Sequence, residues 1–167
     1  MLSISRAMRQ LAEAAPDRAA ITCGERTVPR GELESRTNRL ARVYAEAASA
    51  DVFGRMVTVA LPNGVEFFEA CTAIWKLGGT PHLLSARMPA AEQTSLIELA
   101  DPVLVVGHAP SGGRPHVAAD APVDSAVSDE PLPDVVSPSW KAMCSGGSTG
   151  ARDRDGPERR SDRPVRR

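Results

Sequence analysis

Apolar residues in the first part of the chain recur first at helical and then at strand spacing. Helical spacing holds over residues 4–14 until Pro16 ends it, which predicts an amphipathic opening helix. Residues 19–23 and 26–28 predict two short strands, and Gly24 between them can supply the positive φ of a tight turn. A helix followed by a hairpin is therefore expected.

The middle of the chain predicts longer helices and short apolar strands. Residues 31–48 place apolar side chains on one helical face, and residues 65–77 predict the most buried helix, ended by Gly78. The apolar run at residues 56–61 is typical of a strand covered on both faces. A strand, a helix and another strand are predicted at residues 80–84, 89–100 and 103–106. This alternation predicts an α/β fold, a partial parallel or mixed sheet with flanking helices.

Polar and aromatic side chains in and just before the most buried predicted helix are expected to have structural roles. Asn63 can cap its first turn while Glu66 returns the hydrogen bond. Phe68 and Trp75 are assigned to the core, and Glu69, like Glu66, to a cap or a solvated face. None of these residues is predicted to be catalytic.

The second part of the chain loses this periodicity. Residues 107–136 are rich in Pro, Gly, Ser, Asp and Ala, which predicts a loop or linker. Residues 137–150 predict a strand and a glycine-rich loop. Residues 151–167 carry seven arginines without helical or strand spacing, which predicts a disordered tail. An α/β portion at residues 1–106 is thus followed by three further segments.

Charge and composition narrow the function classes. A formal net charge of -1 over 167 residues gives no field that would attract nucleic acid or an anionic membrane. Acidic residues alternate with the arginines of the tail and no aromatic residue is present for base stacking, so a solvated tail is favoured over nucleic-acid binding. No segment approaches the ~20 apolar residues of a membrane span, and a cytoplasmic protein is expected.

Cysteine and histidine spacing matches no metal or redox motif. Cys23, Cys71 and Cys144 are far apart, and their odd number argues against a secreted disulfide framework, so reduced thiols are expected. No pair among the three histidines has ligand spacing. Each histidine is predicted to lie at the surface or to be satisfied by hydrogen bonds.

Residues 145–150, SGGSTG, are the stretch that carries chemistry. Glycines let the backbone approach a ligand, and successive amides in such a loop form a nest for phosphate oxygens. The hydroxyl groups add donors, and preorganised donors stabilise the charge that develops in phosphoryl or adenylyl transfer. By itself the same composition also fits a plain flexible loop.

In context, SGGSTG resembles the phosphate-loop signature of the adenylate-forming superfamily of acyl-CoA synthetases, Ser/Thr, small, Gly, Ser/Thr, Thr, Gly. Earlier segments resemble the same family in the same order, namely APDRAAI, GELESRTNRLA, VTVALPNGVEFFEACTAIWKLGGTP and ARMPAAE. The resemblance covers residues 14–150. It implies the amino-terminal subdomain portion of an adenylate-forming enzyme.

The resemblance implies that a small carboxylic acid attacks the α-phosphate of ATP with the help of Mg²⁺, and that the acyl group then passes to coenzyme A. It implies an acid–thiol ligase, an acyl-CoA synthetase of fatty acid metabolism, with SPSWKAMCSGGSTG closest to ligases of bulky acids. The β- and γ-phosphates of ATP would be held by Ser145, Gly146, Gly147, Ser148, Thr149 and Gly150. No catalytic residue and no metal ligand is carried over to this chain.

The sequence departs from the family after Gly150. The family continues with a variable residue, proline and lysine, whereas this chain continues Ala151, Arg152, Asp153. Loss of one such donor can lower a rate by about a hundredfold or more. The family also has a much longer chain, so a truncated, weakly active or inactive protein is expected, with the reading frame lost close to Gly150. The alternative is a non-catalytic nucleotide-binding or interaction fragment that pairs with another ligase chain or with itself through open sheet edges.

Overall fold

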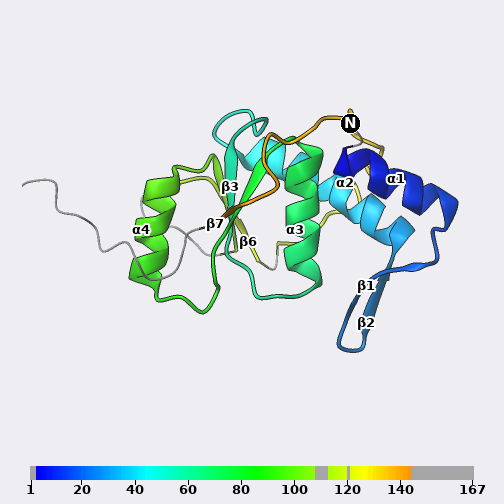
Figure 1. Cartoon of the computed structure of the whole chain (residues 1–167), viewed down its shortest axis with the longest axis horizontal. Helices are drawn as coiled ribbons and strands as arrows, with labels where there is room; N and C mark the ends of the chain where they lie inside the picture. Colours follow the sequence, from blue (N-terminus) through cyan, green and yellow to red (C-terminus); the bar gives the residue numbers. More distant parts are fainter. Residues whose placement is uncertain (1–2, 108–112, 120, 144–167) are drawn as a thin grey trace, which may run out of the picture.

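Four helices and seven strands make up the described part of the chain, residues 3–107, 113–119 and 121–143, in the computed structural model (Figure 1). The helices are α1 (Ile4–Ala14), α2 (Arg30–Ala47), α3 (Val65–Lys76) and α4 (Ala90–Ala100). The strands are β1 (Ala19–Cys23), β2 (Arg26–Pro29), β3 (Met56–Val59), β4 (Thr80–Leu83), β5 (Leu104–Gly107), β6 (His116–Ala118) and β7 (Ala142–Met143). Every predicted helix and strand is present. None of the helices in these ranges is long and apolar enough to cross a bilayer.

Five strands form one parallel sheet in the order β6-β5-β3-β4-β7. At its centre, Thr58 of β3 is in register with His82 of β4 on one side and with Val105 of β5 on the other. The expected partial parallel or mixed sheet is therefore purely parallel in the described residues. β1 and β2 form a separate antiparallel hairpin, as predicted, with Gly24 at φ +60° in the turn.

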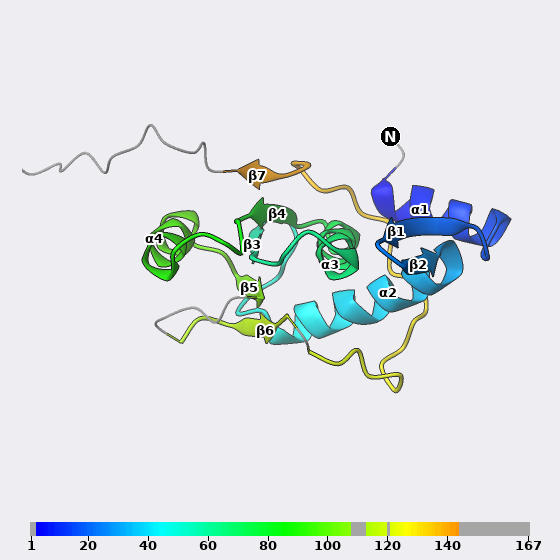
Figure 2. The same cartoon turned by 90° about the horizontal axis from the view of Figure 1, so that it is seen from below.

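Helices cover both faces of this sheet (Figure 2). Val57 and Val59 of β3 belong to the main core together with Ile74 of α3 and residues of α2. Ala60, which continues β3, packs instead with Ile97 of α4. Successive residues of a strand point to opposite faces, so the apolar run of β3 is buried by a helix on each side.

The hairpin and α1 extend the helical layer at one end of the molecule (Figure 1). A smaller core joins Val28 of β2, Leu33 of α2 and Val65 of α3, with Met8 and Ile21 packed against it. The hairpin is thus held by the same helices that cover the sheet.

The segment between β6 and β7 crosses the helical layer from one edge of the sheet to the other (Figure 2). Asp129 accepts a hydrogen bond from the hydroxyl of Ser35 at 2.7 Å and pairs with Arg39 of α2 at 2.8 Å. Further along, Asp134 accepts a hydrogen bond from Ser3 and pairs with Arg6 of α1. Acidic side chains therefore fix this segment to two helices.

The sequence pattern does not predict β6, which lies inside the segment 107–136 expected to be a loop or linker. His116–Ala118 is only three residues long and pairs in parallel with β5. Such a short strand has no periodicity of its own, and its partner alone defines it. The predicted tail, residues 151–167, lies outside the described residues.

Two predictions about the start of α3 are wrong. The helix begins after Gly64 without a side-chain cap, and Glu66 pairs instead with Arg26 of the hairpin at 2.5 Å. Glu69, expected on a cap or a solvated face, is buried and accepts two hydrogen bonds from Arg36 of α2, at 2.5 and 3.0 Å. In both cases an arginine distant in sequence neutralises the carboxylate.

The aromatic residues of α3 divide between core and surface. Trp75 packs against the main core and stacks on Trp140, with ring centroids 4.5 Å apart. Phe68, predicted in the core, is 50% exposed. The predicted end of the helix is confirmed, since Gly78 has φ +71°.

Candidate functional site

The carboxyl ends of the neighbouring strands β3 and β4 lie side by side, and the chain continues from these ends toward opposite faces of the sheet. α3 follows β3 and covers one face of the sheet, whereas α4 follows β4 and covers the other (Figure 2). Connections that diverge in this way leave a crevice between the two loops, and open α/β sheets bind ligands at such crevices. The topology therefore places the candidate site at this edge, the carboxyl edge.

A cavity of about 770 Å³ opens at the carboxyl edge. Its walls come from the loops after β3 and β4, from α3 and from the end of β7, and they comprise Leu61, Pro62, Asn63, Phe67, Leu83, Leu84, Ser85, Ala86, Arg87 and Met143. The volume and the mainly apolar lining with a few polar groups are typical of small-molecule sites. We call this hollow the edge cavity.

Arg87 gives the edge cavity its only cation in the described residues. Its guanidinium is exposed and forms no ion pair with any residue in those ranges. The buried amide of Gln93 holds the loop in place, because its Nε2 donates to the carbonyl groups of Ser85 at 3.2 Å and Met88 at 3.0 Å. The backbone on both sides of Arg87 is held in this manner, and a guanidinium is suited to a phosphate or a carboxylate.

β7 leads toward the predicted phosphate loop from the same edge. It runs parallel to β4 with Leu83 in register with Met143, so the chain leaves β7 beside the edge cavity. Ser145 follows Met143 by two residues in the sequence. Residues 145–150 themselves lie outside the described residues, and their contacts with phosphate stay a prediction.

A buried polar pair links the two strands that end at the edge cavity. The hydroxyl of Thr58 and Nδ1 of His82 are 2.9 Å apart, and both residues are buried. Burial lowers the pKa of His82. The prediction of a satisfied histidine is confirmed for His82, and we assign it no catalytic role.

We expect the burial of His82 to make the free energy of unfolding fall as the pH drops below 6.5. The pKa of His82 is below 6.5 in the folded protein, so the unfolded chain takes up the proton first. This contribution to stability is complete above pH 6.5 and is lost as the pH falls toward the folded-state pKa. Urea denaturation between pH 7.5 and 5.5 measures it, and His82→Gln should reduce the dependence. Equal slopes for both proteins would contradict the prediction.

The described cysteines are free thiols, and Cys71 is not a nucleophile candidate. Cys23 is exposed and Cys71 is buried, and burial raises the pKa of Cys71 to about 12. Nowhere in the described ranges do three or more His, Cys, Asp or Glu side chains come together in a way that could hold a metal ion.

The sequence pattern does not single out Asn63, Ser85 or Arg87 as site residues. A usable signal was present, since each lies within a few residues of the end of a predicted parallel strand. The carboxyl ends of parallel strands are where ligand-binding loops gather.

Comparison with known proteins relates the chain to AMP-binding enzymes. A family model described as AMP-binding enzyme matches residues 8–162. The 2,3-dihydroxybenzoate-AMP ligase of Bacillus subtilis (strain 168) is 35% identical over 85 residues. The match covers 51% of this chain and 15% of that ligase. The chain therefore corresponds to a small part of the relative's length.

Solved structures share the fold at low sequence identity. The nonribosomal peptide synthetase FmoA3 in its AMPPNP-bound form matches with a TM-score of 0.73 and 21% identity, over 85% of this chain and 16% of that one. The Klebsiella oxytoca NpsA N-terminal subdomain in complex with anthranilyl-AMSN matches with a TM-score of 0.72 and 18% identity, over 90% of this chain and 39% of that one. These likenesses confirm the predicted fold class, a parallel sheet with flanking helices.

Proposed function

The chain belongs to the AMP-binding enzyme family, and from this premise we propose that it supplies the nucleotide-binding part of an enzyme that joins a carboxylic acid to AMP. The family match extends over most of the chain. The observation that carries the proposal is the edge cavity, which lies at the divergence of β3 and β4, beside the strand that runs toward residues 145–150. Such a place suits a polyphosphate, because a cation and the loops at the carboxyl edge of the sheet come together there.

The roles that we propose for the chain are to bind and orient. Arg87 would contact a phosphate oxygen, and the amides and hydroxyls of Ser145, Gly146, Gly147, Ser148, Thr149 and Gly150 would hold the β- and γ-phosphates. When bound, ATP supplies the adenylyl group. Donors that are fixed before the reaction stabilise its developing charge without reorganising.

The described residues do not fit a Mg²⁺ site. Mg²⁺ is usually held through one or two carboxylates together with substrate phosphates, and the described lining of the edge cavity contains no Asp or Glu. Mg²⁺ therefore has no carboxylate ligand among the described residues of the edge cavity.

We propose an aromatic carboxylic acid as the substrate class. Support comes from the relatives, one a 2,3-dihydroxybenzoate-AMP ligase and another a subdomain bound to anthranilyl-AMSN. An acyl-CoA synthetase that acts on fatty acids, with coenzyme A as acceptor, is the alternative that the sequence resemblance implies. Comparing 2,3-dihydroxybenzoate with a medium-chain fatty acid in the assay below separates the two.

The test is carboxylate-dependent exchange of pyrophosphate into ATP by the purified chain, alongside thermal shift with ATP and Mg²⁺. Exchange would support an enzyme. A thermal shift without exchange would support the alternative of a non-catalytic nucleotide-binding fragment that pairs with another ligase chain. That alternative draws on β7, which forms one edge of the described sheet, with Met143 62% exposed. Absence of both signals would contradict a nucleotide site.

We expect Arg87→Met to weaken ATP binding by about tenfold, because a charge-assisted hydrogen bond to phosphate is lost while the length of the side chain is largely kept. Isothermal titration with ATP measures the Kd. Arg55→Met is the matched control, since Arg55 is also exposed but precedes β3 at the opposite edge of the sheet. Equal Kd values for the two variants would remove Arg87 from the proposed site.

A further inference from the structure

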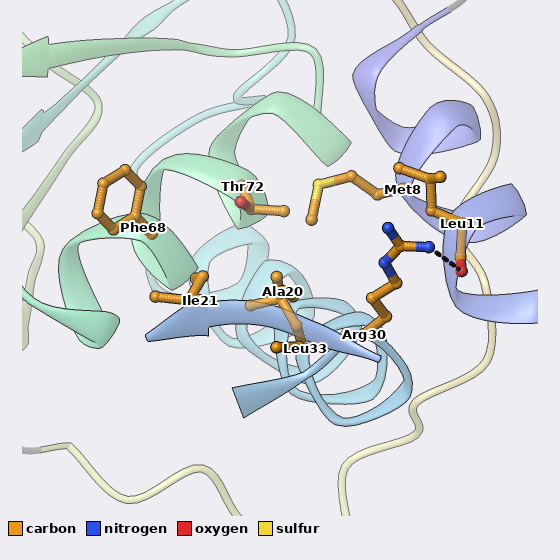
Figure 3. A pocket seen from close by; sticks show the side chains of 9 residues that line it. Met8, Leu11, Ala20, Ile21, Arg30, Leu33, Phe68 and Thr72 are labelled. Carbon is orange, nitrogen blue, oxygen red and sulfur yellow. Dashed lines mark hydrogen bonds between the residues drawn. The ribbon is translucent and has the colours of Figure 1, made fainter. Parts of the chain in front are cut away.

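A second hollow, of about 290 Å³, lies between α1, β1, α2 and α3 (Figure 3). Its walls are mainly apolar, with Met8 and Leu11 from α1, Ile21 from β1 and Phe68 from α3. Leu11 is 49% exposed and Phe68 is 50% exposed, so two large apolar side chains flank the same opening. We call this hollow the hairpin pocket. It shares no lining residue with the edge cavity.

Two polar side chains belong to the otherwise apolar lining of the hairpin pocket. Arg30, the first residue of α2, extends its guanidinium toward α1, where Nη1 lies 3.4 Å from the carbonyl oxygen of Leu11 (Figure 3). Arg30 forms no ion pair with any residue in the described ranges. Thr72 of α3 is buried and lines the pocket, and its hydroxyl forms no hydrogen bond within the same part of the chain.

The pairing of an unneutralised guanidinium with apolar walls indicates the kind of ligand. A guanidinium in partly apolar surroundings is stabilised by an anion, and a carboxylate matches its fork of donors. The apolar walls favour a ligand that is hydrophobic apart from its anionic group. The volume of the pocket lies just below the range of pockets for drug-sized ligands. A single cation matches a single negative charge, which favours a monocarboxylate over a polyphosphate.

We propose that the hairpin pocket binds a small apolar monocarboxylate of about the size of benzoate. The carboxylate pairs with Arg30, and the hydrophobic body lies among Met8, Ile21 and Phe68. The hydroxyl of Thr72 is available to the same ligand as a donor. This site is separate from the proposed nucleotide site and needs no ATP.

The methionines provide a direct test, because Met8 lines the hairpin pocket and Met143 lines the edge cavity. The full chain is labelled with ¹³C at the methionine methyl groups, which gives five signals to follow. Benzoate is titrated without nucleotide. We expect a saturable shift of the Met8 signal, caused by the ring of the ligand, with the Met143 signal unmoved. The neutral isostere benzamide should bind at least about tenfold more weakly, because it lacks the charge.

Two variants and one control make the assignment specific. Arg30→Met should weaken benzoate binding at least about tenfold, and Ala20→Leu should abolish the Met8 shift by filling the pocket from β1. Arg55→Met should leave the affinity unchanged. Arg30→Met and Arg55→Met each add a sixth methionine signal, and the native signals other than that of Met8 report whether each variant is folded. An unmoved Met8 signal in the wild-type chain, or unchanged affinity in Arg30→Met, would overturn the proposal.

The same labelled chain keeps the two proposals distinguishable. ATP is expected to shift the Met143 signal, and its failure to do so would count against the nucleotide site but not against the hairpin pocket. If benzoate shifted Met143 instead of Met8, the acid would bind at the carboxyl edge. That result would overturn the hairpin pocket and would support the proposed function.

Discussion

Glu34→Leu should lower the free energy of unfolding by about 3–5 kcal/mol, because it leaves a buried ammonium group without its carboxylate partner. The side chain of Lys76 on α3 is 0% exposed, and its Nζ lies 2.7 Å from Oε1 of Glu34 on α2. In the variant Lys76 keeps only the side-chain oxygen of Asn38, at 2.6 Å. Such a loss is a large fraction of the ~5–15 kcal/mol that stabilises a typical domain. Urea denaturation at pH 7 measures it.

The mechanism behind this loss predicts two further results. Burial lowers the pKa of Lys76, an effect that Glu34 opposes. Between the lowered folded-state pKa and the unfolded-state value of about 10.4, the unfolded chain binds the proton and the folded variant does not, so the stability of the variant should rise with pH in that window. The double variant Glu34→Leu, Lys76→Met should regain most of the lost stability, since a buried pair replaced by apolar groups is often neutral.

An exposed ion pair provides the matched control for Glu34→Leu. Glu13 lies 4.0 Å from Arg9 on α1 and its side chain is 69% exposed, so Glu13→Leu should change the free energy of unfolding by less than about 1 kcal/mol. Similar losses for the two leucine variants would show that the Lys76 pair is not the source of the effect.

Gly107→Ala should destabilise the protein by about 2–5 kcal/mol, from backbone strain and overpacking together. Gly107 ends β5 at φ +101°, a conformation that side chains rarely adopt. An added Cβ would lie 2.5 Å from the carbonyl oxygen of Ala60 and 2.8 Å from Cδ2 of Leu61. Because the carbonyl belongs to the backbone after β3, it can yield only if the two strands move apart. A fall in Tm of roughly 5–15 °C is expected for a chain of this size.

Gly24→Ala separates the two causes in Gly107→Ala. Gly24 also has a positive φ, +60°, but an added Cβ there would meet no atom within 4 Å. Its cost should be limited to backbone strain, about 1 kcal/mol. If Gly107→Ala lowered the free energy of unfolding no more than Gly24→Ala, the close approach of β5 to the end of β3 would contribute nothing to the loss.

Glycines and apolar periodicity explain how much of the fold was predictable. The helix over residues 4–14 was predicted with its observed bounds, and Gly78 was assigned to the end of α3 with the left-handed φ that it adopts. These signals are local, because each depends on residues within one or two helical turns. The apolar-rich run over residues 56–61, which contains β3, likewise predicted a strand covered on both faces.

The candidate site was predictable only in part, because its parts come from different strands. The sequence indicated a phosphate loop after β7 and the family to which it belongs. It did not indicate Arg87, whose position depends on the divergence of β3 and β4 and on the amide of Gln93. A pattern along one segment holds no information about which loops meet at the edge of a sheet.

By itself the sequence determined the order and type of the main elements and the family of the chain, because periodicity, glycine positions and ordered motifs are properties of neighbouring residues. The tertiary structure alone decided which charges are buried. Glu69 meets Arg36 and Lys76 meets Glu34 only because α2 and α3 pack together, and Glu66 pairs with Arg26 rather than capping its own helix because the hairpin reaches α3. Each of these contacts joins residues more than thirty positions apart, where the energy of a buried charge depends on the fold as a whole.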